Sequence, residues 1–441
     1  MKHIYIITGD FPPSSKVGAL RPFRLAKRLS ASGWQVNIIT KRVRIDFSHN
    51  NNLLDELNDR VSIHYLPGIK KPTTAGTDDQ PKLFSDLTAL GKLMVRIKGT
   101  AWERLGQYIK PDLELMHIPA YIFKFLKISK KTDRCIVLTT SPPHSIHITG
   151  LILHTLTRIP YITDFRDPWD YYPQTGKYEI TNPLERLLEK TIIKHAAAVI
   201  STTRMYNENL KKRHSAIDPD KFHCITNSFD IQKTSKTPSK PSEKFIISYT
   251  GIFYPEKDPF TFFRALGAWL DNLDETEKKK LEQVLEVRLI GSHSRHVAAI
   301  VENLGISKVV RFYARVPHEE AIRLTKMSDM LLICAGIGNK SRPGWLPSKL
   351  IEYLGCQIPI MAICREGEMA SVIRDTKSGY VITSENHHLI QSILKKEIEK
   401  KLTGTESSDF SFQDIKQFQE DVTMKKFSKI INEIAINHIK C

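Results

Sequence analysis

Residues 330–355 read MLLICAGIGNKSRPGWLPSKLIEYLG and carry the pattern that defines the fold most clearly. The apolar run at 330–334 predicts a buried strand, and a glycine-containing loop separates it from a predicted helix that begins near Pro347. Proline suits the first turn of a helix, because the N–H group that it lacks would have no partner there. Strand, loop and helix in this order form the repeating unit of parallel α/β sheets.

The start of this helix has the properties of an anion-binding site. The amides of Ser348 and Lys349 would point out of the helix N-terminus, where the helix dipole favours a group such as a diphosphate. Glu352 lies one turn after Ser348 on the same helix face, where its carboxylate could hold ribose hydroxyls. The alternative interpretation is that Ser348 and Lys349 only cap the helix and that Glu352 is an ordinary surface acid.

Predicted strands and helices alternate along almost the whole chain, which is typical of parallel α/β sheets. The helix predicted at 19–32 is the first of these helices. Strands are predicted at 4–7, 36–40, 61–66, 135–139, 161–163, 198–201, 222–225, 245–249, 287–290, 309–313, 330–334, 358–363 and 379–382.

Two domains are expected, because 441 residues exceed one ordinary core. The best candidate linker is the polar segment 232–242, QKTSKTPSKPS. It predicts an N-terminal Rossmann-like domain at 1–235 and a C-terminal one at 243–411. A helix predicted at about 412–441 could pack back on the first domain. Two such domains leave a cleft between their facing strand ends.

The composition narrows the class of protein. A hydrophobic content of 41% with 26% charged residues is typical of a globular chain. No apolar run reaches the ~18 residues that a membrane span needs, and the first strand meets Thr8-Gly9-Asp10 too early for a signal peptide. Six cysteines show neither metal-site spacing nor a disulfide framework, so we expect reduced thiols in a cytoplasmic protein.

The net charge of +17 indicates a polyanionic partner. Nucleic acid is not expected, because the chain has no zinc-finger or RNP-type motif. Residues 82–109 have helical apolar spacing with interspersed lysines and arginines. This predicted helix either packs on its own domain or rests on an anionic membrane surface. The expected location is therefore cytoplasmic, with peripheral attachment to the inner face of the membrane as an open alternative.

Five motifs, in the same order along the chain, resemble those of the family 4 glycosyltransferases. The first comprises Thr8–Pro13 and Gly18, and the second is DFRDPW at 164–169, similar to a D-x-R-D-x-W stretch in one branch of the family. The other three are ITNSFD at 225–230, YTG at 249–251 with PEKD at 255–258, and PSKLIEY at 347–353 with PI at 359–360. The resemblance covers nearly the whole chain and is closest to the branch with a P-S-K-x-x-E-Y motif.

The resemblance implies a GT-B fold, in which two Rossmann-like domains face each other across a cleft. It also implies transfer of a hexosyl or related sugar from a nucleoside-diphosphate sugar to a glycan or lipid-linked acceptor in cell-surface polysaccharide biosynthesis. Retention of configuration and metal independence are expected, with no cofactor besides the sugar nucleotide. Asp218-Pro219-Asp220 is the only Asp-x-Asp in the sequence, and a turn explains it better than a metal site.

Residues on both sides of the cleft receive roles from this resemblance. Lys257 would stabilise the leaving diphosphate, although it could equally be a surface lysine beside Glu256. Donor-binding positions are Gly18, Gly251, Lys257, Arg315, Val316, Ser348, Lys349 and Glu352.

Three further residues follow predicted strand ends of the N-terminal domain, where clefts of α/β proteins lie. His144 could bond a donor hydroxyl or steady the transition state, or it could be a helix-start histidine without a role. Asp167, with Arg166, could orient the acceptor hydroxyl or act as a base. The alternative is a structural pair between Asp167 and Arg166.

Two departures from the family pattern leave other functions open. Gly344 stands where the pattern has a first glutamate, and Ile252 stands where an arginine is usual. The alternatives are a GT-B sugar-nucleotide epimerase, which acts without an acceptor, and a non-catalytic nucleotide-sugar-binding subunit.

Overall fold

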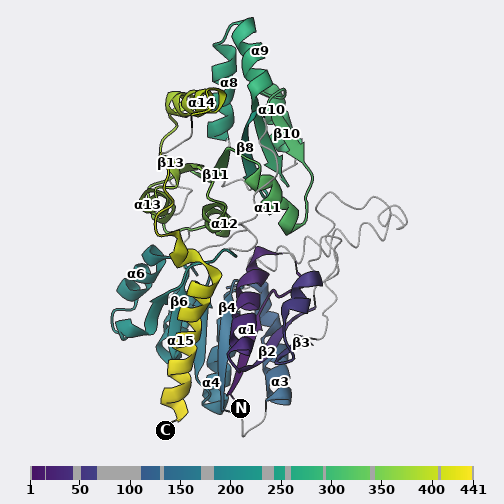
Figure 1. Ribbon diagram of the computed structural model, residues 1–441. Coiled ribbons are helices and arrows are strands. Elements are labelled where there is room, and N and C mark those ends of the chain that lie inside the picture. The colour runs from purple at the N-terminus through teal and green to yellow at the C-terminus, as the bar shows by residue number, and fades with distance from the viewer. Residues whose placement is uncertain are drawn as a thin grey trace, which may run out of the picture.

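The computed structural model describes residues 2–14, 16–42, 51–66, 111–129, 134–169, 183–230, 243–253, 260–291, 295–337, 343–405 and 409–439. It shows two domains, each built on a parallel sheet that is covered by helices on both faces (Figure 1). The predicted linker and the predicted basic helix at 82–109 lie outside the described residues.

The N-terminal sheet has seven parallel strands in the order β3-β2-β1-β4-β5-β6-β7. The order reverses beside β1, as in doubly wound dinucleotide-binding folds. Its strands are β1 (Lys2–Thr8), β2 (Gln35–Lys41), β3 (Val61–Leu66), β4 (Arg134–Ser141), β5 (Tyr161–Phe165), β6 (Ala198–Ser201) and β7 (Phe222–Cys224).

Alternate residues of these strands enter two hydrophobic cores. Ile4 and Ile6 point to one core, and Tyr5 and Ile7 point to the other, because successive side chains of a strand face opposite sides. Helices α1 (Leu20–Ala31) and α15 (Glu420–Ile439) cover the first face. The second is covered by α3 (Ile118–Ile128), α4 (Ile146–Thr157), α5 (Pro183–His195) and α6 (Arg204–Arg213).

The C-terminal sheet has six parallel strands in the order β10-β9-β8-β11-β12-β13. They are β8 (Phe245–Thr250), β9 (Leu285–Ile290), β10 (Val310–Tyr313), β11 (Met330–Gly336), β12 (Ile360–Cys364) and β13 (Gly379–Ile382). The helices are α8 (Phe260–Asp271), α9 (Glu275–Val284), α10 (Arg295–Asn303), α11 (His318–Lys326), α12 (Ser348–Cys356), α13 (Glu368–Asp375) and α14 (His387–Leu402).

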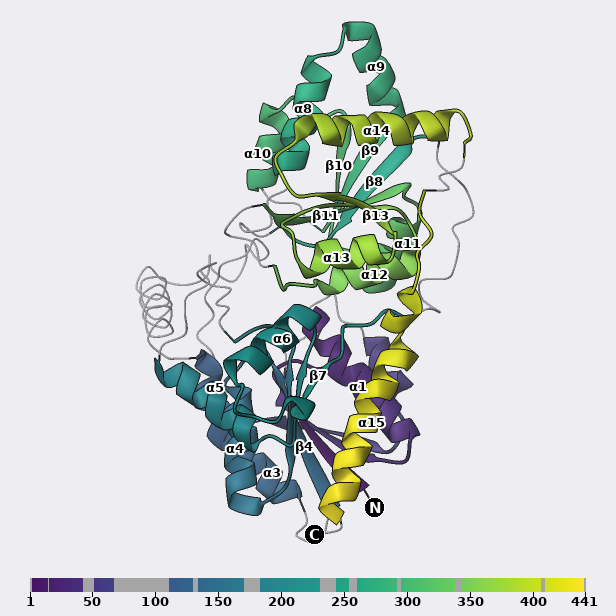
Figure 2. The same ribbon diagram turned by 90° about the vertical axis from the view of Figure 1, so that its left-hand side faces the viewer.

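Helix α15 follows the C-terminal domain in sequence but runs along the N-terminal domain beside α1 (Figure 2). Met424 and Phe427 enter the same core as β1, and the indole N–H of Trp34 donates to Oδ1 of Asn432 at 3.2 Å. Where the chain crosses, the amide of Phe229 donates to the carbonyl of Phe418 at 3.0 Å. Helix α15 thus packs against the core of the N-terminal domain.

All the predicted strands are present, with ends that differ by at most two residues. The helix predicted at 19–32 is α1, and a turn forms at Asp218, whose side chain accepts from the amide of Asp220 at 2.9 Å. The cysteines of the described part of the chain are free thiols. No described helix has the length and apolar character needed to cross a membrane.

Candidate functional site

Helix α12 begins at Ser348, and Pro347 precedes it as the N-cap in an extended conformation. Pro347 thus lies one residue outside the first turn in which we expected it, because its fixed φ also suits an extended cap. No acidic side chain occupies the first turn of α12. The positive end of the helix dipole is therefore not neutralised by a charge of its own turn.

Lys349 and Gly251 lie against each other at the carboxyl end of β8. Nζ of Lys349 is 3.5 Å from the centre of the Tyr249 ring, a cation–π contact. Gly251 has a φ of +110°, and a Cβ atom at this position would lie 3.0 Å from the same Nζ. A side chain at 251 would strain the backbone and displace the ammonium group. The structure thus brings together two predicted donor-binding residues from separate motifs.

Tyr353 fixes helix α12 to strand β8. The amide of Thr250 donates to the Tyr353 hydroxyl at 2.9 Å, and Oγ1 of Thr250 lies 3.1 Å from the same hydroxyl. Burial of the ring raises the pKa of Tyr353 above its usual range, so it stays neutral. Because Tyr353 follows Lys349 by about one turn, its contact also sets the position of Lys349.

Ser348 and Glu352 line one small pocket together with Arg21, Arg24 and Asn227 of the other domain. Their shared face on α12 agrees with the expectation from their spacing. Oε1 of Glu352 also lies 3.5 Å from Nε2 of His318 at the start of α11, and both side chains are partly exposed. Sequence reasoning missed His318, because the two residues are 34 positions apart in the sequence and lie on different helices.

Arg315 and Val316 follow β10 at the same edge of the sheet as Gly251, with β9 between them. Arg315 is exposed and Val316 is half-buried. Ile252, at the position where the family pattern has arginine, is 51% exposed. Lys257 lies outside the described residues.

Arg166 joins three loops of the N-terminal domain. Its guanidinium donates to the carbonyls of Ser141 (2.8 Å) and Pro142 (2.7 Å), after β4, and to the carbonyl of Gly18, after β1. A Cβ atom at Gly18 would lie 2.6 Å from this guanidinium, so glycine is needed there for close approach. Burial lowers the pKa of Arg166 from its usual value. Arg166 therefore holds the segment around Gly18 against the end of β4.

Asp164, the first acid of the DFRDPW motif, forms a buried ion pair with Arg21 of α1 at 2.8 Å. Thr140 also donates to Asp164, and Arg21 donates to the carbonyls of Ile225 and Thr226 at 2.9 Å each. Sequence reasoning gave neither Asp164 nor Arg21 a structural role. The pair holds the residues after β7 against α1.

His144 is buried at the end of β4, 3.1 Å from Oγ of Ser141, and its ring stacks on Trp169 at 5.3 Å. His147 lies one turn further, fully buried, and its Nδ1 is 2.8 Å from Oγ1 of Thr139. Burial lowers the pKa of His147 well below its usual range, and the neighbouring His144 adds to this effect. Sequence reasoning did not single out His147.

Asp167 follows Arg166 in the loop after β5 and is half-buried. Its charge acts on the guanidinium of Arg166. The guanidinium hydrogen bonds of Arg166 are made with backbone carbonyls, as described above. His144 follows β4 and Asp167 follows β5. Because β4 pairs with β5, the two residues follow neighbouring strands of the sheet.

The two domains meet at the loop that leads into α12. Nδ2 of Asn227 donates to Oγ of Ser348 at 2.9 Å, and Oγ1 of Thr203 donates to the carbonyl of Gly344 at 2.9 Å. A Cβ atom at Gly344 would lie 3.4 Å from Cβ of Met205, so a larger residue would face α6. The departure at Gly344 therefore falls at a contact between domains.

Two family models match the chain. One, described as a glycosyl transferase 4-like domain, matches residues 20–228, and the other, described as glycosyl transferases group 1, matches residues 230–408. Their junction falls beside the predicted linker. No curated protein sequence matches the chain.

Solved structures share the arrangement of both domains. A glycosyltransferase from Rickettsia africae ESF-5 is 17% identical with a TM-score of 0.62, over 98% of each chain. Anabaena Alr3699/HepE in complex with UDP-glucose is 12% identical with a TM-score of 0.61, over 97% of this chain and 99% of that chain. The lipopolysaccharide outer core galactosyltransferase WaaB is 13% identical with a TM-score of 0.55, over 98% and 99%. At these identities the likeness shows a shared fold.

Proposed function

The chain belongs to the family 4-like glycosyltransferases of the GT-B fold, and we propose that it moves a hexosyl or related sugar from a nucleoside-diphosphate sugar to a glycan or lipid-linked acceptor. Its pathway would be the synthesis of a cell-surface polysaccharide. HepE holds UDP-glucose, and WaaB is named for lipopolysaccharide outer core synthesis. These two solved structures support a nucleoside-diphosphate sugar as the donor and a glycan or lipid-linked acceptor.

The observation that carries the donor proposal is the contact of Lys349 with Gly251 at the start of α12. Departure of a nucleoside diphosphate places negative charge on the leaving oxygens. The Lys349 ammonium and the positive end of α12 lie together and could meet that charge. Glu352, on the same pocket wall as Ser348, would accept the ribose hydroxyls.

Catalysis would be metal-independent, since cations and a helix N-terminus can stabilise the diphosphate. Lys257, from the same motif as Gly251, would add a second ammonium. The family resemblance implies retention of configuration, with the leaving phosphate helping to deprotonate the acceptor. The protein would then act mainly by positioning and electrostatics.

The acceptor would approach from the N-terminal domain. Asp167 would orient or deprotonate its hydroxyl, and His144 would bond a donor hydroxyl. Arg166 would act through its hold on the loops after β1 and β4. His144 is 6% exposed, so only a small part of its ring is accessible.

The cytoplasmic face of a membrane is the proposed place of action. Exposed apolar side chains gather on three neighbouring helices of the N-terminal domain: Phe123 and Leu126 on α3, Leu156 on α4, and Leu184 and Leu187 on α5. Lysines and arginines lie on the same helices, including Lys124, Lys127, Arg186, Lys190 and Lys194. Apolar and basic side chains together suit an anionic lipid surface.

A thermal-shift screen with EDTA present tests the donor proposal. UDP, UDP-glucose and a panel of other nucleoside diphosphates would be compared on the wild type, Lys349→Ala and Lys279→Ala. Lys279 is an exposed lysine on α9 and serves as the matched control. At a concentration of 100 Kd, a specific ligand stabilises the fold by about 2.7 kcal/mol. Loss of the shift in Lys349→Ala alone supports the site.

An activity assay on the nucleotide sugars that stabilise the protein in this screen separates the alternatives. Sugar transfer by the wild type, followed by product analysis, is the expected result. Interconversion of the sugar nucleotide without any acceptor would instead indicate an epimerase. Nucleotide binding without turnover would indicate a non-catalytic subunit. No shift with any nucleotide would contradict the donor site.

A further inference from the structure

The first turn of helix α6 is completed by a residue of the other domain. The first turn of a helix leaves amides without intrahelical acceptors. The side chain of the N-cap Thr203 accepts from Tyr206, as expected for a cap. The amides of Arg204 and Met205 donate to Oε1 and Oε2 of Glu368, each at 3.0 Å. One carboxylate of the C-terminal domain thus accepts two amides at the positive end of α6.

Glu368 is fixed in place by the loop that leads to α12. Gly367 has a φ of +156°, and a Cβ atom there would lie 2.1 Å from the carbonyl oxygen of Pro343. The amide of Glu368 donates to the same carbonyl at 2.6 Å. The next residue, Gly344, accepts from Thr203. Glu368 and the 343–344 loop therefore contact α6 as one unit.

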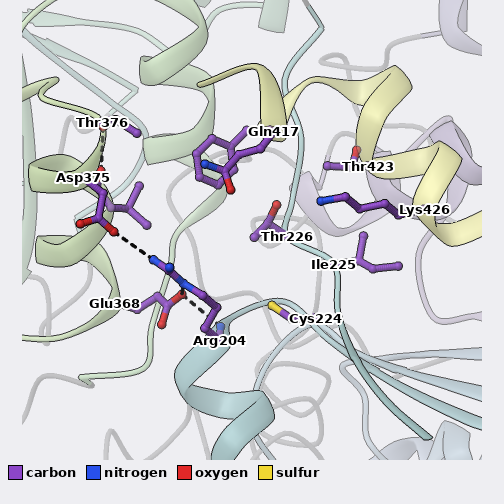
Figure 3. A pocket seen from close by; sticks show the side chains of 12 residues that line it. Arg204, Cys224, Ile225, Thr226, Glu368, Asp375, Thr376, Gln417, Thr423 and Lys426 are labelled. Carbon is purple, nitrogen blue, oxygen red and sulfur yellow. Dashed lines mark hydrogen bonds and ion pairs between the residues drawn. The ribbon is translucent and has the colours of Figure 1, made fainter. Parts of the chain in front are cut away.

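The Arg204 side chain should contribute less to the stability of the contact between the domains than the Arg204 backbone amide does. Figure 3 shows the Arg204 side chain between Glu368 and Asp375 at the wall of a pocket. Its nitrogen atoms lie 3.5 Å from Glu368 and 3.2 Å from Asp375, and the pocket has a volume of about 220 Å³. The Arg204 side chain is 63% exposed, whereas Glu368 is only 3% exposed. Exposed ion pairs contribute little stability, while a carboxylate that accepts amides in a buried position contributes more.

We propose that Glu368 is a positioning residue that fixes the C-terminal domain to the N-terminus of α6. Its contact with the amides of Arg204 and Met205 is called the latch below. The latch sets the loop before α12, and with it Ser348 and Lys349, relative to the strand ends of the N-terminal domain. This consequence for the donor site rests on the proposed function. The latch itself does not, since it is a contact between domains.

Hydrogen exchange of the Arg204 and Met205 amides measures the latch directly and needs no ligand. In Glu368→Ala, both amides lose their acceptor, and we expect exchange at least ~10-fold faster than in the wild type. Glu368→Gln keeps the shape and one acceptor oxygen, so an intermediate rise is expected. This second variant also gives a result if Glu368→Ala does not fold.

Two control variants make the test specific. Glu208→Gln removes an exposed carboxylate of α6 that pairs with Lys211 of the same helix at 3.1 Å, and should leave exchange unchanged. Arg204→Ala removes the exposed side chain but keeps the amide, and should change exchange by less than ~3-fold. Exchange in Glu368→Gln equal to that in Glu208→Gln would overturn the proposal, and so would a large rise in Arg204→Ala alone.

A second measurement separates a latch from a merely stabilising residue. Small-angle X-ray scattering with saturating UDP measures the radius of gyration, and we expect a larger radius in Glu368→Gln than in Glu208→Gln. The UDP affinity of Glu368→Gln should stay within ~3-fold of that of the wild type. Equal radii would overturn the proposal. A wild type that binds no UDP or other nucleotide would contradict the proposed function, and the exchange rates alone would then decide the latch.

Discussion

The carboxyl edges of the two sheets differ in how deeply their ionisable side chains are buried. At the N-terminal edge, Arg21 and Asp164 are paired at 2.8 Å with 5% and 2% of their side chains exposed. At the C-terminal edge, Glu352 and His318 lie 3.5 Å apart with 24% and 27% exposed. The N-terminal pair is therefore almost fully buried, and the C-terminal pair is partly exposed to solvent.

This difference in burial indicates that charged motif residues serve different purposes in the two domains. Buried charges of the N-terminal domain hold its own loops, as Arg166 does with backbone carbonyls. The Glu352 and His318 side chains of the C-terminal domain are instead partly exposed. Substitutions should therefore affect stability at the first edge and sugar transfer at the second.

The largest expected effect is that of Arg21→Ala. It leaves Asp164 buried without its cation, which should lower the free energy of unfolding by about 3–5 kcal/mol. Urea denaturation measures the change. Lys27→Ala is the control, because Lys27 is 44% exposed and pairs with Glu56 at the surface, where an ion pair contributes under ~1 kcal/mol. Equal losses in both variants would contradict the contrast between the edges.

Lys349→Ala should change activity rather than stability. Removing one preorganised cation from the leaving diphosphate should lower kcat by about 100- to 1000-fold. The free energy of unfolding should change by less than ~1 kcal/mol, as for most partly exposed sites. Lys257→Ala should act in the same direction. Steady-state transfer assays, with Lys279→Ala as control, decide this, and unchanged turnover in a folded Lys349→Ala variant would refute it.

Glu352→Ala should have a smaller effect on transfer. Loss of a hydrogen bond to a charged group is worth about 1.5–3 kcal/mol, which corresponds to a 10- to 150-fold fall in kcat/KM. Glu320→Gln, which removes an exposed acid paired with Arg323 on α11, should leave transfer unchanged. Wild-type kcat/KM in a folded Glu352→Ala variant would remove Glu352 from the donor site.

The smallest effect is expected at a surface cluster of one aspartate and two lysines. Lys396 and Lys400 lower the pKa of Asp409 to about 2, so this group stabilises the fold at neutral pH and the contribution is lost as pH falls from about 4 towards 2. Because Asp409 is exposed to solvent, Asp409→Asn should cost only about 0.5 kcal/mol or less. Urea midpoints at pH 7 and pH 3 test this. A difference between the wild-type and Asp409→Asn midpoints that is larger at pH 3 than at pH 7 would contradict the predicted direction of the pH dependence.

The repeating pattern of the sequence was sufficient to predict the strands and the two-domain fold. A short apolar run bounded by turn residues indicates a buried strand from neighbouring residues alone. The ends of β3, β6 and β13 were therefore predicted as observed. The start of α12 was misplaced by one residue, because proline suits both the first turn and the extended cap.

Contacts between distant segments could not be predicted in this way. Arg21 and Asp164 are 143 residues apart, and Glu368 and Met205 are 163 apart. Neither partner has a local signal that names the other. The convergence of Lys349 and Gly251 was expected only from the family resemblance, since each lies in its own motif.

The course of helix α15 has a consequence for synthesis of the protein. Its apolar face completes the core of the N-terminal domain, yet it leaves the ribosome roughly 190 residues after Asp230. At about 5–20 residues per second, that delay is roughly 10 to 40 s. During this interval the nascent N-terminal domain exposes the apolar surface of α1 and β4 that α15 later covers, and we expect chaperones to recognise that surface.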